Sequence, residues 1–129
     1  MKQWSDQELN ALTERVIGLC IAIHRALGPG LLESAYAACL AYELTKAGIA
    51  FKKEVPLPVV YEDVNLDCGY RLDFVIEDAL IIELKAVQKL ERIHQAQVMT
   101  YLKLSARPIA LLINFNVTLL KDGIVRLRN

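Results

Sequence analysis

The fold is decided by residues 70–85, which read Tyr-Arg-Leu-Asp-Phe-Val-Ile-Glu-Asp-Ala-Leu-Ile-Ile-Glu-Leu-Lys. Two apolar runs flank a polar break at 77–79, a pattern that predicts strands at about 70–77 and 80–87 joined as a hairpin. Asp73, Glu83 and Lys85 are ionisable, yet they lie inside these apolar runs. Burying charge is costly unless the charges are paired or bind an ion, so a site is expected here.

A three-residue hairpin loop at 77–79 would place Ile76 opposite Leu80 and Asp73 opposite Glu83. Side chains alternate between the two faces of a strand, so the residues separate into two sets. One face would carry only apolar side chains, namely Leu72, Phe74, Ile76, Leu80, Ile82 and Leu84. The other face would carry every charge, with the set Arg71, Asp73, Val75, Ile81, Glu83 and Lys85.

Two carboxylates directly opposite one another repel, so the pair needs a cation between them or a raised pKa on one of them. A divalent metal ion with Lys85 alongside would satisfy both. Two alternatives stay open. A two-residue loop would shift the register and separate Asp73 from Glu83, and alternating charge is also typical of a solvated strand face. Val75 and Ile81 on the charged face favour the site.

The composition predicts one globular domain spanning residues 1–129. The chain has 129 residues, of which 54% are hydrophobic and 23% charged, which excludes a disordered protein. Lys plus Arg and Asp plus Glu are equal at 15 each, so no overall field attracts nucleic acid. Nucleic-acid binding would need a local basic patch, for which the candidates are Lys52, Lys53, Lys85, Lys89, Arg92 and Lys103.

The cysteines and the N-terminus predict a cytoplasmic protein. Cys20, Cys39 and Cys68 are odd in number, widely spaced and set in apolar surroundings, as expected for reduced thiols. The first residues lack the apolar core of a signal peptide, and no apolar run approaches the ~18 residues of a membrane span, so no membrane partner is expected.

Two helices are predicted before the hairpin, at about 6–27 and 31–47. Ser5 and Glu8 form a capping-box signature for the first helix. In the second helix, Glu33 and Tyr36 are three residues apart and therefore neighbours on the helix surface. Glu33 is a candidate site residue, although a solvated first-turn glutamate stabilised by the helix dipole is the alternative.

Strand patterns occupy several shorter segments, at 50–55, 57–61, 109–113, 117–121 and 124–127. Residues 63–69 are predicted to form a loop. The continuous apolar run at 109–113 is typical of a central strand covered on both faces. Asp122-Gly123 is a strong hairpin signal, which predicts a C-terminal β-hairpin.

A third helix is predicted at about 90–104, where Gln97 and Tyr101 are four residues apart on one stripe. Such a pair can hydrogen-bond to one ligand together. An ordinary polar helix face is the alternative. Helices on both faces of a mixed sheet, an α/β fold, would explain the apolar strands.

This order of elements and residues resembles the PD-(D/E)XK nuclease superfamily, whose restriction-endonuclease-like core runs αβββαβ. The core would span residues 31–114, with an extra N-terminal helix and the C-terminal hairpin outside it. Asp73 followed by Glu83-Leu84-Lys85 is similar to the superfamily signature. Gln97-Val-Met-Thr-Tyr101 is similar to the Gln-x-x-x-Tyr motif of RecB-like nucleases.

A closer resemblance is carried by Gly30-Leu-Leu-Glu33-Ser-Ala-Tyr36, which looks like the signature of the small bacterial GxxExxY proteins, a branch of the same superfamily. The flanking segments 24–30 and 111–116 also look like that family, so the resemblance covers nearly the whole chain.

The resemblance implies a metal-dependent nuclease that hydrolyses phosphodiester bonds. Asp73, Glu83 and the backbone carbonyl of Leu84 would bind Mg²⁺ or Mn²⁺, with Glu33 completing the shell directly or through water. Lys85 would orient the attacking water or neutralise developing charge. Substrate binding would fall to Gln97, Tyr101 and Tyr36.

The partner implied is nucleic acid, with DNA favoured over RNA. A homodimer would widen the footprint, and the C-terminal hairpin or the first helix could form its interface. Two other functions are compatible with the same residues: a catalytically silent nuclease-like binding or assembly module, and a metal-dependent hydrolase of nucleotides. A metal response of the thermal stability would separate the working site from the silent module.

Overall fold

Three helices and a mixed sheet make up the computed structural model, which describes residues 2–129. The helices are α1 (Asp6–Leu27), α2 (Glu33–Lys46) and α3 (Arg92–Ser105). The main sheet has the order β1-β4-β5-β6-β7. Its strands are β1 (Phe51–Pro56), β4 (Arg71–Ile76), β5 (Leu80–Lys85), β6 (Ile109–Asn114) and β7 (Ile124–Arg128). The α/β class, the three helices and the strands of the predicted core are therefore confirmed.

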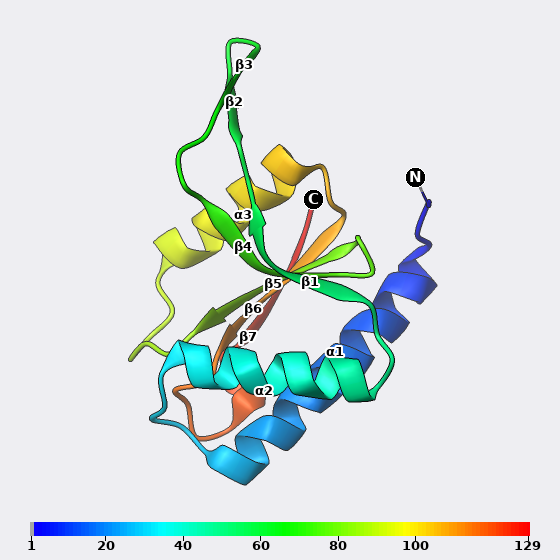
Figure 1. Cartoon of the computed structure of the whole chain (residues 1–129). Helices are drawn as coiled ribbons and strands as arrows, with labels where there is room; N and C mark the ends of the chain where they lie inside the picture. Colours follow the sequence, from blue (N-terminus) through cyan, green and yellow to red (C-terminus); the bar gives the residue numbers. More distant parts are fainter. Residues whose placement is uncertain (1) are drawn as a thin grey trace.

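Helices cover both faces of the sheet, with α1 and α2 on one side and α3 on the other (Figure 1). The strands alternate between two apolar clusters. In β6, Ile109, Leu111 and Ile113 pack toward α1 and α2, whereas Ala110 and Leu112 pack toward α3. Every residue of β6 is buried, as predicted for a central strand, and β6 runs parallel to β5 after the crossover through α3.

The predicted hairpin register is confirmed. Ile76 pairs with Leu80 across the β4–β5 hairpin, and Phe74 pairs with Ile82. The loop between them is made possible by Glu77 and Asp78, which both adopt left-handed backbone conformations with φ of 53° and 55°. The register therefore brings Asp73 toward Glu83, on which the site depends.

The predicted separation of the two hairpin faces is wrong at Leu72. Leu72 was expected beside Phe74, but it packs in the cluster under α3 instead. The regular alternation stops between these residues, because the β4–β5 ladder is interrupted at Asp73, and the neighbouring strand is irregular at Glu54. The interruption is a feature of the site described below.

The predicted C-terminal strand at 117–121 is wrong. After β6 the chain makes a bend and a short 3₁₀ helix, η1 (Leu120–Gly123), and the hairpin partner of β7 is β6 itself. Gly123 is needed for close packing rather than for a two-residue turn. A Cβ atom added there would lie 2.3 Å from the backbone oxygen of Asn114.

A second, two-stranded sheet was only half predicted. It consists of β2 (Val59–Tyr61) and β3 (Val64–Leu66), and β3 falls within the expected loop at 63–69. Three exposed residues are too few to show a strand period, so the sequence carried little signal for β3. In Figure 1 this hairpin projects away from the main sheet.

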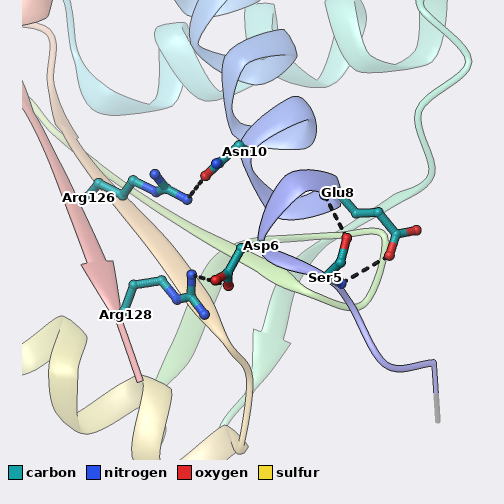
Figure 2. Close-up of polar contacts among 6 residues, drawn as sticks. All are labelled: Ser5, Asp6, Glu8, Asn10, Arg126 and Arg128. Carbon is teal, nitrogen blue, oxygen red and sulfur yellow. Dashed lines mark hydrogen bonds and ion pairs between the residues drawn. The ribbon is translucent and has the colours of Figure 1, made fainter.

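The first helix is tied at its N-terminus to the last strand. The predicted capping box is present, because Ser5 Oγ accepts from the Glu8 amide and the Glu8 carboxylate accepts from the Ser5 amide, both at 3.0 Å. Arg128 pairs with Asp6 at 3.0 Å, and Arg126 donates to the Asn10 side chain (Figure 2). Within residues 2–129, no helix combines the length and apolar character needed to cross a membrane.

Candidate active site

The ladder between β4 and β5 is replaced by side-chain hydrogen bonds at Asp73 and Glu83. The Asp73 amide donates to Glu83 Oε1 at 3.0 Å, and the Leu84 amide donates to Asp73 Oδ2 at 2.8 Å. Each carboxylate thus bonds to the opposite strand through one oxygen. This leaves Asp73 Oδ1 and Glu83 Oε2 for a ligand at the point where the strands separate.

Burial disfavours the ionised form of both carboxyl groups. Glu83 is only 7% exposed, and desolvation followed by the charge of Asp73 raises its pKa to about 8. Desolvation also raises the pKa of Asp73, with further contributions from the charges of Glu54 and Glu33. The backbone hydrogen bonds oppose these shifts without cancelling them. The electrostatic conflict expected from the sequence is therefore present.

Lys85 is a positively charged residue that acts on both carboxyl groups. Its charge lowers the pKa of both Asp73 and Glu83, in opposition to the burial of those groups. The end of β5 is held firmly, because the side-chain amide of the buried Asn114 bonds to both backbone groups of Val87, at 3.1 and 2.9 Å. Lys85 is half-buried at the rim of the site.

Glu33 is the first residue of α2, and its charge acts on both carboxyl groups. Its negative charge raises the pKa of both Asp73 and Glu83. It does not complete a preformed ligand set, because no three His, Cys, Asp or Glu side chains among residues 2–129 are grouped closely enough to hold a metal ion.

Glu54 is a further acidic residue of the site that the sequence did not indicate. It lies in β1 between two residues that pair with β4 on either side of Asp73, and its charge raises the pKa of Asp73. Its backbone has φ of 52°, an uncommon conformation for a residue other than glycine. Only the register between β1 and β4 reveals it, and one sequence does not specify that register.

Tyr101 and Gln97 lie on α3. The pKa of Tyr101 is raised by burial first, and then by the charges of Glu83, Tyr70 and Asp73. Gln97 is exposed and lines the same surface groove as Tyr101. The two residues therefore share one surface, as their spacing predicted, and Tyr101 lies within electrostatic reach of the carboxylates.

A family model described as the PD-(D/E)XK nuclease superfamily matches residues 10–127. The chain belongs to this superfamily. The order α2, β1, β4, β5, α3, β6 is the one that the resemblance led us to expect, with the β2–β3 hairpin as an insertion. No curated protein matches the sequence.

One residue of the predicted PD-(D/E)XK site is placed elsewhere. Tyr36 was expected to bind substrate, but its side chain is fully buried and stacks on Phe115 with ring centroids 4.3 Å apart. Its hydroxyl donates to the Gly28 carbonyl at 2.6 Å and accepts from the Leu31 amide at 3.2 Å. Tyr36 therefore closes the turn that precedes Glu33 and has no surface left for a substrate.

The oxygen atoms that remain suit a hard divalent cation. Mg²⁺ prefers oxygen ligands, keeps several of its waters, and is commonly held by only one or two carboxylates. Asp73 and Glu83 supply two, and their raised pKa values mean that a cation would relieve a repulsion already present. The chemistry of Asp73 and Glu83 therefore fits Mg²⁺ or Mn²⁺.

Proposed function

We propose that the protein is a metal-dependent nuclease that hydrolyses phosphodiester bonds of nucleic acid, with DNA as the expected substrate. The observation that carries the proposal is the opened β4–β5 ladder. There, two coupled carboxylates each keep an oxygen free beside Lys85. Membership of the nuclease superfamily supports this reading of the geometry.

The residues of the site have different proposed roles in metal binding and catalysis. Asp73, Glu83 and the Leu84 carbonyl would hold Mg²⁺ or Mn²⁺, which when bound supplies Lewis-acid polarisation of the phosphate and a more acidic water. Lys85 orients the attacking water or neutralises charge that develops on the phosphate oxygens. Glu33 would complete the ligand set of the metal directly or through water.

The α3 residues would contact the substrate. Gln97 and Tyr101 would position the nucleic-acid backbone or a water, and their place in the lining of one groove supports this role. The chain has no net charge, so phosphate attraction must be local. Apart from the half-buried Lys85, the basic residues proposed for this patch are exposed, namely Lys52, Lys53, Lys89, Arg92 and Lys103. The homodimer and its interface stay predictions.

The direct test is cleavage by the purified protein of single-stranded, duplex and branched DNA and RNA. We expect cleavage with Mg²⁺ or Mn²⁺, none with EDTA, and a loss of at least about 100-fold in Lys85→Ala, typical of removing a group that stabilises developing charge. Lys46→Ala is the matched control, because Lys46 is an exposed lysine at the far end of α2. Equal activity in Lys85→Ala and the parent would overturn the assignment.

Metal titration separates a working site from a silent nuclease-like module. Metal that binds the folded protein stabilises it by about 2.7 kcal/mol at 100 times its dissociation constant. We expect thermal stability to rise with Mn²⁺ in the parent and not in Asp73→Asn. An identical response in both proteins would place the metal elsewhere.

A further inference from the structure

A groove of about 390 Å³ lies between α3, the start of β2 and the segment that precedes β4, and phosphate chemistry does not explain its lining. Its walls come from α3, from the start of β2 and from Tyr70, which immediately precedes β4. The lining is mainly apolar, with Val59, Ile93, Ala96 and Leu104 in addition to two tyrosines. Gln97 and Thr100 are the polar residues of the lining, and both are uncharged. None of the side chains that line the groove is cationic, so its interior suits a neutral group better than a phosphate.

The two tyrosines form an aromatic wall in this groove. The ring centroids of Tyr70 and Tyr101 are 6.1 Å apart and the rings are tilted by 55°, so neither ring is stacked on the other. Tyr70 is 45% exposed, which leaves ring surface free for contact. Its backbone is fixed, because the Tyr70 carbonyl accepts from the Leu57 amide at 3.0 Å.

Two residues of the groove connect it to the candidate active site. Tyr101 lines the groove, and its pKa is raised first by burial and then by the charges of Glu83, Tyr70 and Asp73. Tyr70 precedes Asp73 by three residues along an extended segment, a separation of roughly 10 Å between Cα atoms. If a nucleic-acid strand bound with one phosphate at the carboxylates, the base next to that phosphate would therefore lie within reach of the groove.

We propose that this groove holds one unpaired nucleobase, stacked on Tyr70, next to the phosphate that is cleaved. The inference rests on the proposed function, since it places the strand at the same site. Neutral, planar bases stack on aromatic side chains without sequence preference, and this contact supplies affinity where net charge does not. Bases inside a duplex are already stacked and paired, so the groove selects single-stranded nucleic acid or a frayed end.

Binding of a single-stranded DNA oligonucleotide tests the proposal without relying on cleavage. The measurements use the Lys85→Ala background, which keeps the oligonucleotide intact, and a series of oligonucleotides with one abasic position each. We expect Tyr70→Leu to weaken binding by about 5- to 150-fold, the change for losing one base–aromatic stack. Tyr70→Phe keeps the ring and is expected to bind like its parent. Tyr42→Leu is the matched control, since Tyr42 is a 65% exposed tyrosine on α2.

The decisive result is a double-mutant cycle between Tyr70 and the abasic positions. At one position, removing the base should cost as much as Tyr70→Leu, and the two changes together should cost no more than either alone. Unchanged binding by Tyr70→Leu, or an equal loss at every abasic position and with blunt duplex, would overturn the inference. If the parent protein cleaves DNA but Tyr70→Leu does not weaken oligonucleotide binding, the nuclease proposal stands and the groove proposal fails. If Tyr70 stacks on a base but the protein cleaves no nucleic acid, the groove proposal stands and the nuclease proposal fails.

Discussion

The two ends of the β4–β5 hairpin are built from the same two strands but behave in opposite ways. Near the loop, Ile76 pairs with Leu80 in a regular ladder, and both side chains are fully buried in the cluster under α1 and α2. At the far end, the ladder gives way to bonds between backbone amides and the carboxylates of Asp73 and Glu83. The end near the loop stabilises the fold, whereas the far end holds two carboxylates whose mutual repulsion a bound cation would reduce.

This difference explains how a strained site can persist. Burial raises the pKa of Glu83 to about 8, which means that ionising it in the folded protein costs free energy. The apolar pairs near the loop, together with the fully buried β6 alongside, hold the strands in place despite that cost. Stability and function should therefore respond to different substitutions in one hairpin.

The largest effect on stability is expected at the regular end. Ile76→Ala removes a fully buried side chain from the core and should lower the free energy of unfolding by about 2–5 kcal/mol, as measured by urea denaturation. The stabilisation by Mn²⁺ should survive in this variant, because the carboxylates are untouched. Loss of the metal response together with stability would break the proposed separation of the two ends.

At the open end, Glu83→Gln should change the dependence of stability on pH. A carboxyl group with a raised folded pKa favours folding when protonated, so its contribution is complete below about pH 4.5 and is lost as the pH rises toward 8. In EDTA, the parent should lose on the order of 2–4 kcal/mol over this range through Glu83. Thermal or urea unfolding at a series of pH values measures this loss.

The glutamine variant should lack most of that decline, and it should be more stable than the parent at pH 9 without metal. It should also lose the response to Mn²⁺. Parallel pH profiles for the two proteins would contradict the raised pKa and remove the electrostatic argument for a cation at this end.

Much of this contrast could be predicted from the sequence, because it depends on local patterns. The polar break at 77–79 predicted the hairpin, and a three-residue loop was one of two possibilities. The structure has the three-residue loop, with Ile76 opposite Leu80, and this register brings Asp73 to Glu83. The first helix, from its capping box to Leu27, followed equally directly from local signals. In each case residues close in sequence determine the result.

What could not be predicted depends on contacts between distant segments. Glu54 joins the site only through the register of β1 against β4, and Tyr70 meets Tyr101 only once α3 packs on the sheet. The sequence Asp122-Gly123 predicts a turn, whereas the role of Gly123 in the structure is its close approach to the backbone of Asn114. That approach is a tertiary contact. No sequence periodicity carries such information.

Tyr36 offers the smallest and most discriminating test, because sequence and structure assign it different roles. Tyr36→Phe keeps the ring on Phe115 but removes the hydroxyl that bonds to Gly28 and Leu31. Losing these buried hydrogen bonds should lower the free energy of unfolding by about 1–2 kcal/mol. Oligonucleotide affinity at a temperature well below unfolding should stay at the parental value. A weaker affinity without a loss of stability would return Tyr36 to the substrate surface and would mean that the functional region extends from the open end of the hairpin into the turn before α2.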